Sequence, residues 1–229
     1  MIKAIIFDFD GVLVESVDVK TQAFAELFRG YGPQVVQQVV DYHLDNGGVS
    51  RFEKFKYYYR EILRRPLSEA KLDQLCQQFN SIVVEQVVRA PLVEGAATFL
   101  NQNYTKYDFF VASATPQDEI EDIVRRREMS FYFKGVLGSP REKDLLTQDI
   151  IDSGNYEPGE VIFVGDALSD YEAAQKTGCH FIGRVSSGSK NLFPQGTIII
   201  PDLGELAGIV SQLNNGKADE NLIKQVTPQ

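Results

Sequence analysis

Cysteine is scarce in this chain of 229 residues, which contains only Cys76 and Cys179. Each of the two lies in an apolar stretch, and their separation matches no metal-binding spacing. Two such thiols exclude the disulfide framework of small secreted domains and a zinc site built on cysteines. We expect both to be small core residues, with a single structural disulfide as the minor alternative.

Positive charge is also in short supply. The sequence has 23 lysines and arginines against 32 aspartates and glutamates, with a formal net charge of −9 and a pI near 4.8. A surface of this charge repels polyanions, so nucleic acid and anionic membranes are not expected as primary partners. A small anionic substrate is not excluded, since one local cation or metal ion outweighs a distant negative field.

Long apolar runs are missing as well. No window approaches the length that crosses a membrane, and the amino-terminal run MIKAIIF ends at Asp8. That run is too short and too acidic for a signal peptide, so we predict a cytoplasmic protein without a membrane span. Hydrophobic residues still make up 43% of the chain, which is enough for a sizeable packed core.

Short apolar runs alternate with helical patterns along most of the chain. The strand-like runs are residues 2–7, 107–112, 135–138, 161–165, 180–183 and 197–200. The helical patterns are residues 96–101, 117–127, 143–153, 169–177 and 203–213. Strands that alternate with helices predict an α/β fold with a Rossmann-like parallel sheet that is covered on both faces.

Residues 17–89 break this rhythm and predict an all-helical insert after the first strand. One segment, residues 51–63, places five apolar side chains on one helical face: Phe52, Phe55, Tyr59, Ile62 and Leu63. Ser68 is the expected N-cap of another helix. We predict a core of residues 1–16 and 90–229, an insert of residues 17–89, and a frayed tail at residues 214–229.

Asp8 and Asp10 follow the first strand in the string FDFDGVLVES. Ligands of open parallel sheets bind at the carboxyl ends of the strands. Two carboxylates two residues apart on an extended segment point to the same side, so both can face one reacting group. The alternative is a pair of solvated loop aspartates, which short motifs of this kind often are.

Asp166 and Asp170 form a second acidic pair, in VIFVGDALSDYEAA, again where a strand ends and a helix begins. Carboxylates that crowd together repel one another unless a cation or a proton intervenes. Hard cations such as Mg²⁺ prefer oxygen ligands. The two pairs together predict a magnesium site made by Asp8, Asp10, Asp166 and Asp170, although Asp170 alone is also typical of a helix N-terminus.

Both acidic strings are similar to motifs of the haloacid dehalogenase-like superfamily, and the sequence resembles phosphatases of this superfamily. The similar branch carries a helical cap after the first strand and includes phosphoglycolate phosphatases and β-phosphoglucomutases. Four short motifs occur in order along nearly the whole chain: DFDGVLVES, VASAT, the lysine in GSPREKDLL, and GDALSD. The resemblance implies that residues 17–89 are this cap domain.

The resemblance also implies roles for single residues. Asp8 would be the nucleophile and Asp10 the general acid and base, while Ser113, Thr115 and Lys143 would bind the phosphate group. Asp166 and Asp170 would be metal ligand and supporting carboxylate. Lys134 is a rival to Lys143, but it precedes its strand-like run, whereas Lys143 follows one.

The activity implied is Mg²⁺-dependent hydrolysis of a small soluble phosphomonoester, a phosphorylated metabolite, through a covalent aspartyl phosphate. Asp10 favours cleavage of a C–O–P ester over C–halogen or C–P cleavage. A phosphomutase is the first alternative, but Lys20 stands where β-phosphoglucomutases usually have a histidine. A non-catalytic binding protein on the same fold is the second alternative.

The predicted cap offers few substrate contacts. Arg51, in the string GVSR, resembles the arginine with which mutases meet the far end of their substrate, and Lys20 is a second candidate. An exposed arginine at a helix start is the alternative for Arg51. Tyr57 and Tyr58 face either the site or the packing of the cap, and His43 is expected to be only a helix-end residue.

Overall fold

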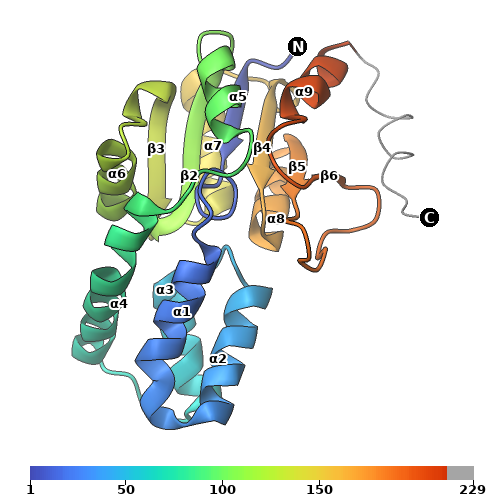
Figure 1. Cartoon of the computed structure of the whole chain (residues 1–229). Coiled ribbons are helices and arrows are strands. Elements are labelled where there is room, and N and C mark those ends of the chain that lie inside the picture. Colours follow the sequence, from blue (N-terminus) through green and yellow to red (C-terminus); the bar gives the residue numbers. More distant parts are fainter. Residues whose placement is uncertain (216–229) are drawn as a thin grey trace.

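A six-stranded sheet lies at the centre of the protein, whose computed structural model describes residues 1–215 (Figure 1). Its strands are β1 (Ala4–Phe7), β2 (Asp108–Pro116), β3 (Phe133–Ser139), β4 (Val161–Gly165), β5 (His180–Arg184) and β6 (Ile198–Ile200). They run in the order β3-β2-β1-β4-β5-β6, and every neighbouring pair is parallel. The predicted α/β fold is confirmed.

Helices cover both faces of the sheet. The helices are α5 (Ala96–Asn103), α6 (Gln117–Arg126), α7 (Lys143–Gly154), α8 (Leu168–Thr177) and α9 (Leu206–Asn214). On β1, Ile5 and Phe7 pack with α5, α6 and α9, whereas Ala4 and Ile6 pack with α7 and α8. Because both faces are buried, the strands read as continuous apolar runs rather than as alternating ones.

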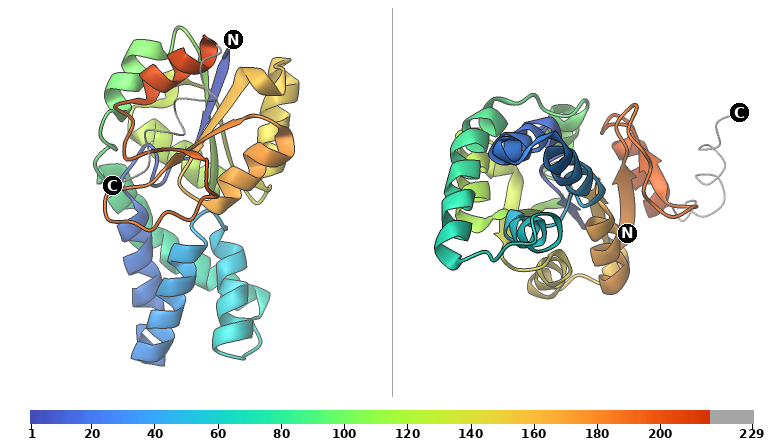
Figure 2. Two further views of the ribbon diagram at one scale, coloured as in Figure 1. Left: turned by 90° about the vertical axis from the view of Figure 1, so that its right-hand side faces the viewer. Right: turned by 90° about the horizontal axis from the view of Figure 1, so that it is seen from below.

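Four helices separate β1 from α5, and they form a bundle at the carboxyl edge of the sheet (Figures 1 and 2). They are α1 (Val17–Phe28), α2 (Pro33–Asp45), α3 (Arg51–Tyr57) and α4 (Glu69–Arg89). The side chain of Ser68 accepts a hydrogen bond from the backbone N–H of Lys71, which confirms the predicted N-cap of α4. Aromatic rings fill the bundle, with Phe24 and Phe79 4.4 Å apart between ring centroids.

The predicted helix over residues 51–63 is α-helical only as far as Tyr57, and a π-helical turn, η2 (Tyr58–Ile62), follows. A π turn accommodates one more residue than an α turn, which rotates the apolar face. Tyr58, the first residue of that turn, is fully buried, with its ring centroid 5.6 Å from Phe24 and 5.2 Å from Phe28. Tyr57 stacks on Tyr42 at 3.7 Å, so both tyrosines belong to the packing of the bundle.

The two segments that join the bundle to the sheet lie side by side. Val14 and Leu92 form an antiparallel bridge. The backbone N–H of Glu15 donates to the carbonyl of Pro91 at 3.0 Å, and that of Val93 donates to Leu13, also at 3.0 Å. The chain therefore enters and leaves the bundle through one paired ribbon.

Three short 3₁₀ turns complete the described elements: η1 (Arg29–Tyr31), η3 (Ser130–Tyr132) and η4 (Pro158–Glu160). Cys179 is buried, Cys76 is half-buried, and both are free thiols. Among the helices of residues 1–215, none has both the length and the apolar character needed to cross a membrane. Of the tail expected to fray, residues 214–229, Asn214 is the last residue of α9, and residues 216–229 lie outside the described residues.

Candidate active site

The acidic residues lie where neighbouring parallel strands end. Asp8 follows β1 directly, Asp166 follows β4, and Asp170 lies in the first turn of α8. Strand β1 pairs with β2 on one side and with β4 on the other. From β1 the strand order runs through β2 to β3 on one side and through β4 to β6 on the other, so the order reverses at β1. A crevice at such a point is the usual ligand site of open α/β folds.

Three of the four predicted metal-binding carboxylates come together. One oxygen from each of Asp8, Asp166 and Asp170 lies within 4.8 Å of the other two. Burial raises the pKa of Asp8 to about 6; the charge of Lys143 lowers this pKa, while the negative charges of Asp170 and Asp10 raise it further. Burial and the charge of Asp8 raise the pKa of Asp166 well above its usual range. Oxygen ligands that repel one another so strongly fit a hard divalent cation.

Lys143, the first residue of α7, reaches this carboxylate cluster. Its Nζ donates to Oδ2 of Asp8 at 2.8 Å and also to Oδ1 of Asp170. Burial alone would lower the pKa of Lys143, but Asp170 and Asp8 hold it above its usual value. Three carboxylates and one ammonium leave two negative charges, which a divalent cation balances. Lys134 instead is exposed on β3, 3.8 Å from Asp108.

The carboxylate of Asp10 lies outside this cluster and faces the helical bundle. Ser16 Oγ donates to Oδ1 at 2.6 Å, while Lys20 Nζ at 2.5 Å and Thr115 Oγ1 at 3.1 Å donate to Oδ2. Burial would raise the pKa of Asp10, but Lys20 and the hydrogen bonds lower it below the usual value. The structure therefore separates Asp10 from the other three predicted metal ligands.

Ser113 and Thr115 stand at the end of β2, beside β1. Ser113 is almost fully buried, and its Oγ accepts a hydrogen bond from the backbone N–H of Thr115 at 3.1 Å. Lys20 Nζ donates to Oγ1 of Thr115 at 2.9 Å. Ser113 keeps its hydroxyl proton free for an incoming oxygen, whereas the hydroxyl of Thr115 is already held between Lys20 and Asp10.

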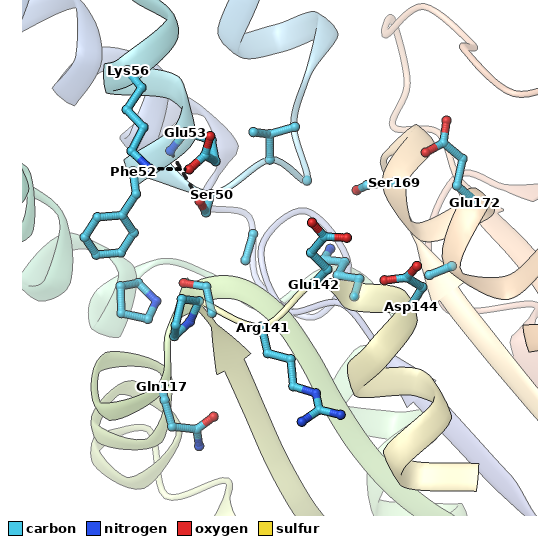
Figure 3. A pocket seen from close by; sticks show the side chains of 18 of the residues that line it. Ser50, Phe52, Glu53, Lys56, Gln117, Arg141, Glu142, Asp144, Ser169 and Glu172 are labelled. Atoms are coloured by element: carbon cyan, nitrogen blue, oxygen red, sulfur yellow. Dashed lines mark hydrogen bonds and ion pairs between the residues drawn. The ribbon is translucent and has the colours of Figure 1, made fainter. Parts of the chain in front are cut away.

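A small chamber of about 80 Å³ contains most of these side chains. Asp8, Asp10, Ser113 and Asp166 line it from the sheet, and Lys20 lines it from the bundle. A larger cleft of about 820 Å³ adjoins it, with Lys143 in its wall and Ala114 in the walls of both. Figure 3 shows Ser50, Glu53 and Lys56 of the bundle facing Glu142, Asp144 and Ser169 across this cleft.

Two glycines permit the close contacts around the chamber. Gly11 has a φ of +79°, and a Cβ there would lie 2.1 Å from Oδ2 of Asp166. A Cβ on Gly48 would lie 1.8 Å from Oγ of Ser169. Gly11 needs glycine for its backbone conformation and for space, whereas a side chain at Gly48 would have to displace the hydroxyl of Ser169. The Gly47–Gly48 turn of the bundle thus lies against Ala167 and Ser169, at the start of α8.

Arg51, a predicted substrate contact, is placed elsewhere. Its guanidinium forms an ion pair with Glu119 of α6 and lies 4.7 Å from the ring centroid of Phe79. Asn80 of α4 donates to the second oxygen of Glu119 at 2.6 Å. Arg51 is 94% buried and lines neither the chamber nor the cleft, so in this structure it joins the bundle to the sheet domain. A buried charge needs such a partner. The alternative of an exposed arginine at a helix start therefore does not describe Arg51 in this structure.

His43 and Lys54 were not predicted to take part in the site. His43 lines the chamber, and its Nδ1 lies 2.7 Å from Nζ of Lys54. Burial and the charge of Lys54 lower the pKa of His43 to about 2, while burial and the charge of Lys20 lower that of Lys54 to about 7. Neither residue belongs to a motif, and only the rarity of histidine in this sequence distinguishes His43.

Comparison with known proteins gives a consistent result. Residues 5–184 match the family model described as haloacid dehalogenase-like hydrolase. A phosphoglycolate phosphatase of Aliivibrio fischeri is 23% identical over 188 residues, covering 78% of this chain and 82% of the relative. A phosphorylated carbohydrates phosphatase of Thermotoga maritima is 23% identical over 223 residues, covering 94% and 89%.

Solved structures share the fold. A β-phosphoglucomutase from Clostridium difficile matches with a TM-score of 0.77 at 17% identity, over 94% of this chain and 99% of that one. A predicted phosphoglycolate phosphatase from Haemophilus somnus matches with a TM-score of 0.71 at 18% identity, over 91% and 98%. At such identities the likeness concerns the fold alone.

Proposed function

Because the chain belongs to the haloacid dehalogenase-like hydrolase family, we propose that it is a Mg²⁺-dependent phosphatase of a small phosphomonoester. The observation that carries this proposal is the cluster of Asp8, Asp166 and Asp170, with Lys143 bonded to two of the three. The names of the relatives, phosphatases of phosphoglycolate and of phosphorylated carbohydrates, support a small phosphorylated metabolite as substrate.

The proposed reaction has two steps on Asp8. First, a carboxylate oxygen of Asp8 bonds to phosphorus, the bond from phosphorus to the alcohol oxygen breaks, and Asp10 gives that oxygen a proton. Water then attacks the phosphorus of the aspartyl phosphate while Asp10 takes its proton. The products are the alcohol, inorganic phosphate and the regenerated Asp8 carboxylate.

Asp10 suits both steps. Although burial opposes it, Lys20 keeps the pKa of Asp10 low, so the carboxylate is ready to act as a base toward water. A phosphate dianion beside it would raise that pKa, because nearby negative charge favours the protonated form. Asp10 then holds the proton that the leaving oxygen needs. Oδ2 of this carboxyl group lies 2.5 Å from Nζ of Lys20.

The remaining residues bind and neutralise the phosphoryl group. Lys143 donates to Asp8 and Asp170 and supplies positive charge where the dianion approaches. Ser113 offers its hydroxyl proton to a phosphate oxygen. Asp8, Asp166 and Asp170 would hold Mg²⁺, which when bound neutralises developing charge as a Lewis acid.

We also propose that residues 17–89 act as a cap domain on a core of residues 1–16 and 90–229. Their helices lie at the carboxyl edge of the sheet (Figure 1), and Lys20 and His43 of this segment line the chamber. A closed cap excludes bulk water while the aspartyl phosphate forms. The phosphomutase alternative predicts slow net phosphate release and a need for a bisphosphate activator, which a steady-state phosphate assay detects.

The test uses the full chain with Mg²⁺ and a panel of phosphorylated metabolites. Asp8→Asn keeps the shape of the side chain but removes the nucleophile, so phosphate release should fall by at least about a thousandfold. Denatured wild-type protein from steady state should carry phosphate on Asp8. The matched control, Asp73→Asn on the exposed side of α4, should keep full activity. Full activity in Asp8→Asn would contradict the proposal.

A further inference from the structure

A histidine and a lysine lie buried together on the cap side of the chamber. His43 belongs to the last turn of α2 and Lys54 to α3, and they are 96% and 98% buried. Nζ of Lys54 contacts Nδ1 of His43 at 2.7 Å and the carbonyl oxygen of Gly47 at 3.3 Å. Both contacts of this buried amine go to neutral acceptors, an arrangement that structural lysines rarely adopt.

This contact decides which nitrogen of His43 carries the proton. As an ammonium, Lys54 has hydrogens to donate and no lone pair, so Nδ1 accepts and the proton of the neutral ring sits on Nε2. The pKa of His43, lowered to about 2 by burial and by Lys54, keeps the ring neutral. His43 therefore presents an N–H donor at Nε2, and Lys54 fixes this tautomer.

The Nε2 donor has no partner within residues 1–215. It is one of the few buried side-chain nitrogens there without a hydrogen bond. Buried donors without acceptors are rare in folded proteins and call for an explanation. Packing explains only part of the position of His43. Its ring centroid lies 4.9 Å from that of Phe24, but the residue also lines the chamber.

The place of His43 tells which part of a substrate it would meet. Asp8, Ser113 and Lys143 come from the sheet domain and surround the phosphoryl group in the proposed reaction. His43 and Lys20 line the chamber from the bundle, and Lys20 contacts Asp10, which serves the ester oxygen in the proposed reaction. The atoms next to His43 are therefore those of the alcohol part of the ester.

We propose that His43, oriented by Lys54, is a substrate-binding residue whose Nε2–H donates to an oxygen of the alcohol part of the phosphomonoester. This inference rests on the proposed phosphatase function and narrows its substrate class. The enzyme selects alcohols that carry an acceptor oxygen close to the ester, such as polyols and hydroxy acids. Esters without such an oxygen cannot accept the hydrogen bond from Nε2–H of His43.

Kinetics with two probes test the proposal. A hexose monophosphate has hydroxyl oxygens near the ester, whereas phenyl phosphate has none. His43→Ala should lower kcat/KM for the hexose monophosphate by about tenfold or more, mainly through KM, and leave phenyl phosphate nearly unchanged. His43→Gln, which retains an N–H donor, should recover part of the loss, and Lys54→Met should reproduce part of it.

The exposed His180, the other histidine of the chain, gives the matched control. His180→Ala should leave both probes unchanged. An equal loss on both probes in His43→Ala would mean a structural role and overturn the proposal. Melting temperatures of the variants show whether such a loss comes from unfolding.

A second measurement needs no turnover, so it separates this inference from the proposed function. Only two imidazoles contribute to the NMR spectrum, and His180→Ala assigns them. His43 should show the Nε2–H tautomer, and in Asp8→Asn with Mg²⁺ that signal should shift with hexose monophosphate more than with inorganic phosphate. The Nδ1–H tautomer, or an equal response to both, would overturn the proposal even in an active phosphatase.

Discussion

Nζ of Lys143 lies 2.8 Å from Oδ2 of Asp8, although 135 residues separate the two in the sequence. Both side chains are buried, and Lys143 also bonds to Asp170. The lysine begins α7, after β3 at one side of the sheet, whereas Asp8 follows the central strand β1. The parallel sheet thus brings the Lys143 ammonium, from the connection after β3, to Asp8 after β1 and to Asp170 after β4.

Removing Lys143 should destabilise the metal-free protein. Lys143→Met leaves Asp8 and Asp170 buried without their cation, and breaking one partner of a buried ion pair costs about 3–5 kcal/mol of unfolding free energy. Urea unfolding in the presence of a chelator measures this loss. Lys176→Met, which breaks the exposed pair with Asp144, is the control and should change stability little. An unchanged unfolding free energy in Lys143→Met would show that the buried contact contributes nothing.

Stabilisation by Mg²⁺ should grow with pH. The pKa of Asp8 is raised from 3.8 to about 6 in the folded protein, so below that pH the folded state holds a proton that a cation must displace. Between 3.8 and about 6 the folded state binds more protons than the unfolded chain, so this group's contribution to metal-free stability falls as pH rises. The increase in melting temperature on adding Mg²⁺ should therefore be small below about pH 6 and larger above it.

Asp166→Asn provides the control for this metal effect, because it removes one ligand of the carboxylate cluster. Most of the Mg²⁺-dependent rise in melting temperature should disappear in this variant at every pH. A rise that is as large in acid as at neutral pH would contradict the assignment of Asp8 to the metal site.

Breaking the Arg51–Glu119 pair should affect folding more than catalysis. Arg51→Met leaves Glu119 buried with only Asn80 as partner, which should cost about 3–5 kcal/mol of unfolding free energy. The double variant Arg51→Met/Glu119→Leu, with no charge left to bury, should regain most of that stability.

The same variants decide the original prediction for Arg51. If Arg51 only joins the bundle to the sheet domain, the double variant should also regain most of kcat/KM. If Arg51 instead contacted substrate, kcat/KM would stay low in the double variant while stability recovered. Arg125→Met, at an exposed pair with Asp122, is the control for loss of an arginine.

The sheet and its acidic edge could be predicted because both depend on local sequence. Val161–Gly165 is one of the predicted strands, residue for residue, since a strand buried on both faces is a short apolar run between polar loops. Parallel strands then place whatever follows them at one edge, so Asp8 and Asp166 meet without further information.

The contacts of the cap depend on tertiary packing and could not be predicted. Arg51 finds Glu119 68 residues away, and helix periodicity says nothing about which acid a cation will meet. The π turn at Tyr58–Ile62 is a local irregularity that an α-helical wheel does not anticipate. Asp10 pairs with Lys20 of α1, a partner that the short acidic motif does not specify.

The paired ribbon at Val14 and Leu92 restricts how the two halves of the molecule can move. Two separate linkers would let the helical half twist and translate, whereas two hydrogen-bonded linkers bend only together, about one hinge axis. If the helical half moves as the proposed cap, Lys20 and His43 would move away from Asp8 in a single motion. Release of product and loss of the proposed alcohol contacts would then occur together.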